Sequence, residues 1–206
     1  VISLMAANAS STMAPWGGKT PFFGTNPWAF GAPRVGDPLV IDSSSSATAF
    51  VNLAQAAATG ARIPAHWALD SDGHPTTDAT AAMAGSIAPA GGHKGAALAL
   101  MIEVIAAGLT GANWSFQASS LGDDLGGPPR LGQTIIAIRP DGVGRSGFGP
   151  ALETLLAAMT ADEGVRIPGE RRHENRHQTE RLGVTLSTKE SKILSKLAAL
   201  PGGAAE

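Results

Sequence analysis

The chain alternates between short apolar runs and longer stretches in which apolar residues follow helical spacing. Apolar runs of strand length occur at residues 1–7, 39–41, 134–138 and 165–167. Each run is bounded by Pro, Gly, Asp or polar residues, which is typical of short buried strands. We therefore predict a strand at each of these four places.

Helices are predicted between these strands. Five segments have the spacing of a helix: residues 47–59, 80–85, 96–109, 150–161 and 188–200. The segment 96–109 is apolar around most of its circumference, which is typical of a helix enclosed by protein. Because strands and helices alternate along the chain, the pattern predicts an α/β fold.

Two stretches rich in Pro and Gly are predicted to be mostly irregular. They cover residues 8–33 and 63–78. Loops of this length in a compact domain are often functional.

The composition fits one globular domain. The 206 residues are 43% hydrophobic and 16% charged, so the chain can bury a core. We predict one domain over residues 1–200, with residues 201–206 as a frayed tail. The formal net charge of -2 gives no overall attraction to nucleic acid, and we expect no nucleic-acid partner.

The cysteine content and the lengths of the apolar runs indicate the cellular compartment and whether the chain spans a membrane. The chain has no cysteine, which excludes disulfides, thiol catalysis and thiolate metal sites and favours a cytoplasmic protein. The longest apolar stretch, residues 96–112, is interrupted by Glu103 and is shorter than the roughly 20 residues that a membrane-spanning helix needs. We therefore expect no membrane segment.

The sequence Gly91-Gly-His-Lys-Gly95 directly precedes the apolar helix. Free backbone N–H groups, the positive end of the helix dipole and the Lys94 ammonium could converge there on one anion, such as a phosphate. Alternatively, the glycines only let the helix approach its neighbours, and Lys94 is solvated. We interpret His93 as a structural residue, because no nucleophile or metal partner is adjacent.

Asp42 follows a predicted strand and precedes the serine run 43–46. A carboxylate at that position can accept hydrogen bonds from ribose or amide groups. The alternative is a helix N-terminus, in which Ser46 or a neighbour caps the next helix and Asp42 faces its dipole.

The segment Gly142-Val-Gly-Arg-Ser-Gly147 matches the G-x-G-x-x-G dinucleotide fingerprint, and Asp162 follows about 20 residues later. Two extra residues separate the fingerprint from its strand, and the remaining chain is too short for two mononucleotide-binding halves. A flexible surface loop is the favoured interpretation. The pair His173 and His177 is interpreted as a solvated surface rather than a metal site.

Several weak motifs occur together in order. They are Ala14-Pro-Trp-Gly-Gly18, Gly24-Thr-Asn-Pro27, Leu39-Val-Ile-Asp42, Ile63-Pro, Trp67-Ala-Leu-Asp70, Gly73 with Thr76-Thr-Asp78, Gly91-Gly-His-Lys-Gly95 and Ile167-Pro-Gly-Glu170. In this order the chain resembles the malate/L-lactate dehydrogenase-like family of NAD(P)-dependent oxidoreductases. The resemblance implies a three-layer α/β/α fold with a mixed sheet, which binds the nicotinamide cofactor without a Rossmann fold. It also implies a homodimer.

The resemblance also implies the site residues. Asp42, Ser43 and Ser44 would contact NAD or NADP, together with Lys94 and the turn formed by Pro168, Gly169 and Glu170. Asn8 and Asn26 would lie near the nicotinamide and substrate. The substrate would be a small 2-hydroxy or 2-oxo acid or a cyclic imino acid, and the serine run most resembles the members that reduce cyclic imino acids.

One departure from the family pattern concerns catalysis. The histidines that act in this family have no counterpart in the sequence, which opens at Val1 within an apolar run, so no catalytic residue is assigned. We interpret the chain as the C-terminal two thirds of the family fold, and expect little activity from it alone. The alternative is a truncated, non-catalytic protein that binds cofactor without turnover.

Overall fold

The computed structural model describes residues 1–122, 125–140 and 147–199. Contacts divide the chain into two units, Val1–Gly169 and Glu170–Glu206. The one-domain prediction for residues 1–200 stays a prediction, and residues 201–206 lie outside the described part.

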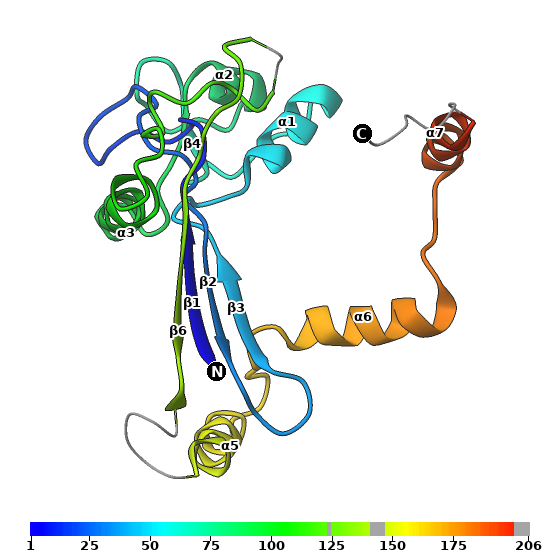
Figure 1. The fold of residues 1–206 in the computed structure, drawn as a ribbon. Helices are drawn as coiled ribbons and strands as arrows, with labels where there is room; N and C mark the ends of the chain where they lie inside the picture. The colour runs from blue at the N-terminus through cyan, green and yellow to red at the C-terminus, as the bar shows by residue number, and fades with distance from the viewer. Residues whose placement is uncertain (123–124, 141–146, 200–206) are drawn as a thin grey trace, which may run out of the picture. The chain divides into compact units, whose positions relative to one another are not determined.

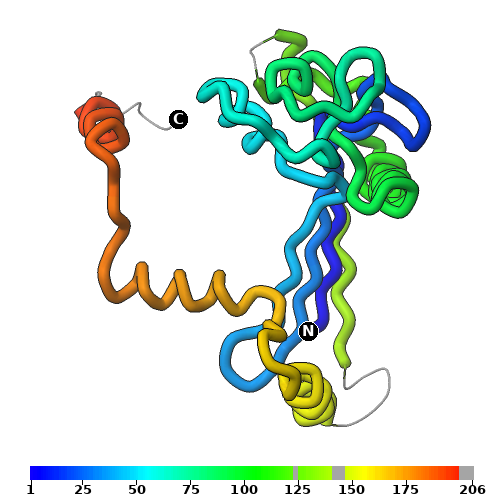
Figure 2. Tube along the Cα trace, turned by 180° about the vertical axis from the view of Figure 1, so that it is seen from behind, coloured from blue at the N-terminus to red at the C-terminus, as the bar shows by residue number. Residues whose placement is uncertain are grey.

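The first unit is built on a four-stranded sheet with the order β3-β2-β1-β6. Its strands are β1 (Ile2–Ala7), β2 (Trp28–Ala32), β3 (Leu39–Ser43) and β6 (Gln133–Ile138). Figures 1 and 2 show the four strands side by side from both directions. A two-stranded sheet pairs β4 (Ala68–Leu69) with β5 (Ser86–Ile87).

All three ladders of the larger sheet are antiparallel. The prediction of an α/β fold is confirmed, and an antiparallel sheet agrees with the expected absence of a Rossmann fold in the described part. The prediction of a mixed sheet is wrong for this sheet. The helices between β3 and β6 gather near one end of the sheet instead of crossing its face to make parallel pairs (Figure 1).

The helices of the first unit begin and end close to their predicted places. They are α1 (Phe50–Thr59), α2 (Ala79–Ala84), α3 (His93–Glu103), the π-helix η1 (Val104–Gly108) and α5 (Phe148–Met159). Gly60 ends α1 in the left-handed conformation, with φ 68°. The predicted strand at residues 165–167 is wrong, because these residues have no regular structure.

The core forms three small clusters. One joins Leu53 of α1 to Ile63 and Ile87, and a second joins Ala6 of β1 to Ile102 of α3. The third contains Met13, Phe23 and Ala99. Thus α3 and η1 pack against the sheet near the end of β1 that carries Ala6.

The outer side of α3 differs from the prediction of an enclosed helix. Leu100 and Met101 of α3, and Val104 at the start of η1, are each about half exposed. A hollow of about 220 Å³ lies between α3 and the sheet, lined by apolar side chains that include Leu4 and Trp28. The helix therefore has more apolar surface than the described part of the chain covers.

The second unit contains α6 (Glu170–Leu182) and α7 (Thr188–Ala198). Neither helix has a buried residue. His173 and His177, interpreted from the sequence as solvated surface, lie in α6, and no helix was predicted at this place. Ser187 and Glu190 form a reciprocal capping box at the start of α7.

Candidate functional site

The end of β3 meets the loop that starts α3. The backbone N–H of Ala90 donates to the carbonyl of Ser45 at 2.9 Å, and the N–H of Ala47 donates to the carbonyl of Ala88 at 2.8 Å. The serine run that follows Asp42 therefore lies beside the segment that precedes Lys94. Two of the predicted cofactor segments are brought together in this way.

Glycine at position 95 permits this close approach. A Cβ there would lie 2.4 Å from the Ala90 carbonyl oxygen and 2.6 Å from the Ser45 carbonyl oxygen. Gly91 and Gly92 have φ values of 61° and 66°, which favour glycine. The glycines in this loop therefore allow close packing and an unusual backbone path, as the structural interpretation of the motif required.

Lys94 lies in the first turn of α3, and its side chain is exposed. No acidic residue occupies that turn, and the ion pairs found in the described residues do not include Lys94. A lysine beside the positive end of a helix dipole is unfavourable unless an anion neutralises both. The geometry is therefore compatible with the phosphate-binding interpretation.

The third predicted segment also contacts β3. Gly169 has φ +88°, and a Cβ on it would lie 2.6 Å from the carbonyl oxygen of Val40. Val40 precedes Asp42 by two residues on the same strand. The Pro168-Gly169 turn therefore lies against β3, whereas Glu170 starts α6 in the second unit.

Asp42 and Ser43 are exposed residues at the end of an edge strand. The Ser44 and Ser46 hydroxyls are 3.0 Å apart. The capping alternative is wrong, because α1 begins after Ala49 without a side-chain cap. Ser46 instead donates to the carbonyl of Thr48.

Asn8 and Asn26 are both buried. Asn26 is fully buried with φ 41°, and its side-chain amide donates to the carbonyl of Ala99 and to Glu103. The Asn8 side chain accepts from the N–H of Gly132 at 2.8 Å and donates to the carbonyl of Asn113 at 2.9 Å. In this structure the two side chains hold loops together, and their role toward substrate stays a prediction.

Sequence reasoning missed Glu103 and Ser115 as partners of these asparagines. Both are buried, and the Ser115 hydroxyl donates to Glu103 at 2.6 Å. One signal was available, because Glu103 is the only charged residue in the apolar stretch 96–112. A lone carboxylate in a buried helix needs hydrogen-bond donors around it.

A hollow of about 670 Å³ lies at the start of α3, between the 14–18, 73–75 and 88–92 loops. Trp16 and His66 line it. The Trp16 ring meets the His93 ring edge to face, with the ring centroids 6.2 Å apart. The hollow therefore combines aromatic side chains with loops that contain glycine. Nearby, the backbone N–H of His74 donates a hydrogen bond to the Asp70 carboxylate, and this bond is the main cause that lowers the pKa of Asp70. The same bond stabilises the turn at residues 70–74.

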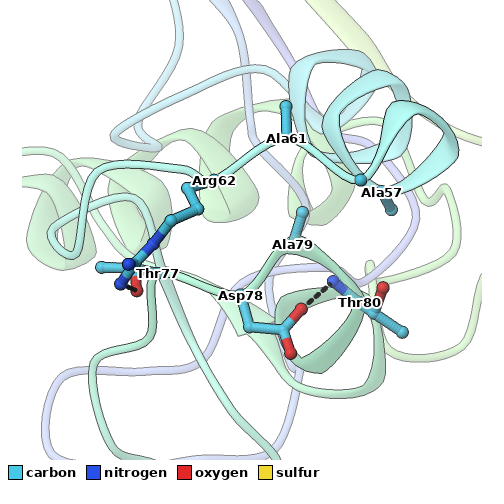
Figure 3. Close-up of a pocket in the computed structure, with 8 residues that line it drawn as sticks. Ala57, Ala61, Arg62, Thr77, Asp78, Ala79 and Thr80 are labelled. Atoms are coloured by element: carbon cyan, nitrogen blue, oxygen red, sulfur yellow. Dashed lines mark hydrogen bonds between the residues drawn. The ribbon is translucent and has the colours of Figure 1, made fainter.

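A second hollow, of about 370 Å³, lies between α1 and α2 and is shown in Figure 3. The Arg62 guanidinium donates to the Thr77 hydroxyl at 2.6 Å, and Asp78 accepts from the N–H of Thr80 at 2.8 Å. Asp78 thus caps α2, and Arg62 fixes the preceding loop. These contacts support the fold.

Within the described residues, neither a metal-binding cluster nor a membrane-spanning helix is found. His66, His74, His93 and His177 are exposed, and His173 is half-buried. Across the described ranges, His, Asp and Glu form no cluster of three that could hold a metal. No helix in the described part has both the length and the apolar content needed to span a bilayer. The G-x-G-x-x-G fingerprint lies mainly in residues 141–146, outside the described residues.

Comparison with known proteins gives a consistent family. Residues 1–195 match the family model described as malate/L-lactate dehydrogenase. The chain is 49% identical over 179 residues to a (2R)-3-sulfolactate dehydrogenase (NADP(+)) of Chromohalobacter salexigens, covering 86% of this chain and 54% of that protein. It is 38% identical over 199 residues to a Δ1-pyrroline-2-carboxylate/Δ1-piperideine-2-carboxylate reductase of Pseudomonas putida, covering 96% and 58%.

Solved structures agree with these relatives. The fold matches Δ1-piperideine-2-carboxylate reductase from Pseudomonas syringae with a TM-score of 0.88 and 37% identity, over 95% of this chain and 60% of that one. Sulfolactate dehydrogenase from Methanocaldococcus jannaschii matches with a TM-score of 0.84 and 29% identity, over 96% and 58%. The chain spans a little more than half the length of the relatives it matches.

Proposed function

The chain belongs to the malate/L-lactate dehydrogenase family, and we propose that it forms the cofactor-binding part of an oxidoreductase that uses NAD or NADP. The observation that carries this proposal is that two predicted cofactor segments contact β3 and the serine run that follows it, at separate places. The Val40 carbonyl contacts Gly169, and the Ser45 carbonyl contacts Gly95 beside Lys94. These contacts place Gly169 beside β3 and the loop before Lys94 beside the serine run that follows Asp42.

The chemistry of these residues supports binding of a dinucleotide. Lys94 and the start of α3 would hold the phosphates, since an ammonium and a helix N-terminus both attract anions. Asp42, Ser43 and Ser44 would accept and donate hydrogen bonds to a ribose, and Pro168, Gly169 and Glu170 would form the second cofactor loop. When bound, the nicotinamide supplies hydride chemistry, and the protein supplies orientation and charge.

We propose a small 2-hydroxy or 2-oxo acid or a cyclic imino acid as the substrate. The sulfolactate and imino-acid names of the relatives support this class. Asn8 and Asn26 would act near the substrate by fixing the loops at the end of β1, because their side chains are already engaged in buried hydrogen bonds.

We also propose that the protein is cytoplasmic and forms a homodimer. The absence of cysteine supports a reducing compartment. The half-exposed apolar side chains of α3, among them Leu100 and Met101, support a surface that a second copy could cover. Light scattering after size exclusion measures the oligomeric state directly.

Replacing Lys94 tests the cofactor site. We expect Lys94→Ala to weaken binding of NADPH or NADH by about 10- to 150-fold, because a charge-assisted hydrogen bond contributes about 1.5–3 kcal/mol. Quenching of tryptophan fluorescence measures the affinity. The matched control is Lys192→Ala, an exposed helix lysine in α7, which should leave the affinity unchanged. Equal losses from both variants would contradict a specific role for Lys94.

A second candidate function is cofactor binding without turnover. It is favoured by the surface positions of the histidines, since none is fully buried beside Asn8 or Asn26 to serve as a proton donor. Oxidation of reduced cofactor with pyruvate, glyoxylate or Δ1-piperideine-2-carboxylate separates the two functions. Steady turnover supports the oxidoreductase, whereas tight cofactor binding with no turnover supports the second function.

A further inference from the structure

Glu103 is a buried acid that takes no part in the proposed chemistry. It is the last residue of α3 and is only 3% exposed. Its carboxylate accepts hydrogen bonds from the Asn26 amide at 2.7 Å, the Ser115 hydroxyl at 2.6 Å, the Ser115 N–H and the Asn8 amide. The ion pairs found in the described residues do not include it. Neutral donors alone therefore compensate for its burial.

These donors come from segments far apart in the chain. Asn8 follows β1, Asn26 lies in the turn before β2, and Ser115 lies in the loop after η1. The turn at Asn26 has a left-handed backbone, which costs energy for a residue other than glycine unless its surroundings hold it. The bond to Glu103 is one of the contacts that hold this turn.

The Asn26 turn also holds Ser45, which follows the proposed cofactor residues Ser43 and Ser44. The Ser45 hydroxyl donates to the carbonyl of Asn26 at 3.0 Å, and the Ser45 N–H donates to the carbonyl of Thr25 at 2.9 Å. Ser45 is fully buried, and its own carbonyl accepts from Ala90. Hydrogen bonds thus run from Glu103 through Asn26 to Ser45, the neighbour of Ser44.

We propose that Glu103 is the positioning residue of the cofactor site. By holding the Asn26 turn, it fixes Ser45 and thereby sets the distance between Ser44 and the start of α3, where Lys94 lies. This proposal rests on the proposed function, because it assumes that cofactor binds at Ser44 and Lys94. Glu103 itself does not touch the cofactor.

The test is Glu103→Gln in the full chain. The side chain keeps its size, but one acceptor oxygen becomes an NH2 group that faces the donors of Asn26 and Ser115. We expect the affinity for NADPH to fall about tenfold, the size of effect typical of a lost hydrogen bond to a charged group. We also expect faster amide exchange in a peptide covering residues 43–47, measured by mass spectrometry without cofactor.

The control separates positioning from general loss of stability. Ile63→Ala removes buried side-chain atoms from a different cluster, which contains Leu53 and Ile87. It should lower the melting temperature but leave NADPH affinity within about twofold and exchange at residues 43–47 unchanged. A merely structural role for Glu103 predicts the same behaviour for Glu103→Gln.

Different results would contradict the proposed cofactor binding and the positioning role of Glu103. A parent chain that binds neither NADPH nor NADH contradicts the proposed function, while the exchange data still test the hold of Glu103 on Ser45. A parent that binds, with unchanged affinity and unchanged exchange in Glu103→Gln, overturns the positioning role alone. If Glu103→Gln does not fold, Ser115→Ala removes one donor to the same carboxylate. Unchanged exchange at residues 43–47 in that variant overturns the proposal.

Discussion

The helices α3 and α6 have similar lengths, 11 and 13 residues, and neither has separate polar and apolar faces. In α3 nearly every residue after Lys94 is apolar, and Ala99 and Ile102 are buried. In α6 nearly every residue is polar, and none is buried. Helix α3 therefore depends on tertiary packing, whereas α6 depends on local interactions such as the Arg176–Glu180 ion pair at 2.8 Å.

The largest expected effect tests the packing of α3. Ile102→Ala should cost about 2–5 kcal/mol of unfolding free energy, because it leaves a cavity beside Ala6 and Ala106. Leu100→Ala, at a half-exposed position on the same helix, should stay within about 0.5 kcal/mol. Urea denaturation measures both.

Urea denaturation also tests whether α3 and α6 differ in how much they depend on packing. Gln178→Ala in α6 replaces an exposed residue and should also stay within about 0.5 kcal/mol. If Leu100→Ala proves as costly as Ile102→Ala, the outer side of α3 is covered in solution. In that case α3 depends on tertiary packing even more than the described residues show, and its difference from α6 is larger.

A smaller effect is expected in the second unit. Ser187→Ala removes the side-chain acceptor of the α7 capping box and should cost about 1 kcal/mol of local helix stability. Amide exchange in α7 should then speed up about fivefold, while exchange in α3 stays the same. Faster exchange in both helices would show that α7 also depends on packing against other parts of the protein.

The smallest effect concerns a half-buried ion pair of the first unit. The Arg34 guanidinium donates to Glu153 of α5 at 3.0 Å and lowers the pKa of that carboxyl below its ordinary value of 4.5. The pair therefore stabilises the fold above about pH 4.5, and this contribution is lost as the pH falls through the lowered value.

Glu153→Gln measures this contribution. The difference in unfolding free energy between the parent and Glu153→Gln should be largest near neutral pH and should shrink in acid. A difference that does not change with pH would show that Glu153 acts through packing. Helix α6 provides the comparison, because its Arg176–Glu180 pair is exposed on both sides and should contribute little.

Much of the secondary structure could be predicted from apolar patterns. The strand at residues 134–138 and the helix at 188–200 agree with β6 and α7 to within one or two residues. Strand β2 was missed because Gly31 and the flanking prolines interrupt its pattern. Helix α6 was missed because its polar sequence has no periodic apolar signal.

The site was predictable only in part. The segments around Asp42, Lys94 and Gly169 could be named from motifs, but the approach of Gly169 to Val40 and of Gly95 to Ser45 depends on close backbone contacts that no motif reveals. The buried bonds of Glu103 were out of reach for the same reason. They join residues up to 95 positions apart, and only the folded chain brings them together.

The position of β1 in the sheet has a kinetic consequence. In the sheet β1 lies between β2 and β6. Strand β2 follows within about 30 residues, whereas Gln133 of β6 lies 126 residues beyond Ala7. At a synthesis rate of about 5–20 residues per second, β6 leaves the ribosome roughly 6–25 seconds after β1. For that time the side of β1 that later pairs with β6 lacks this partner. Closing the sheet must therefore wait for the whole α1–η1 region, which makes β1–β6 pairing the expected slow step of folding.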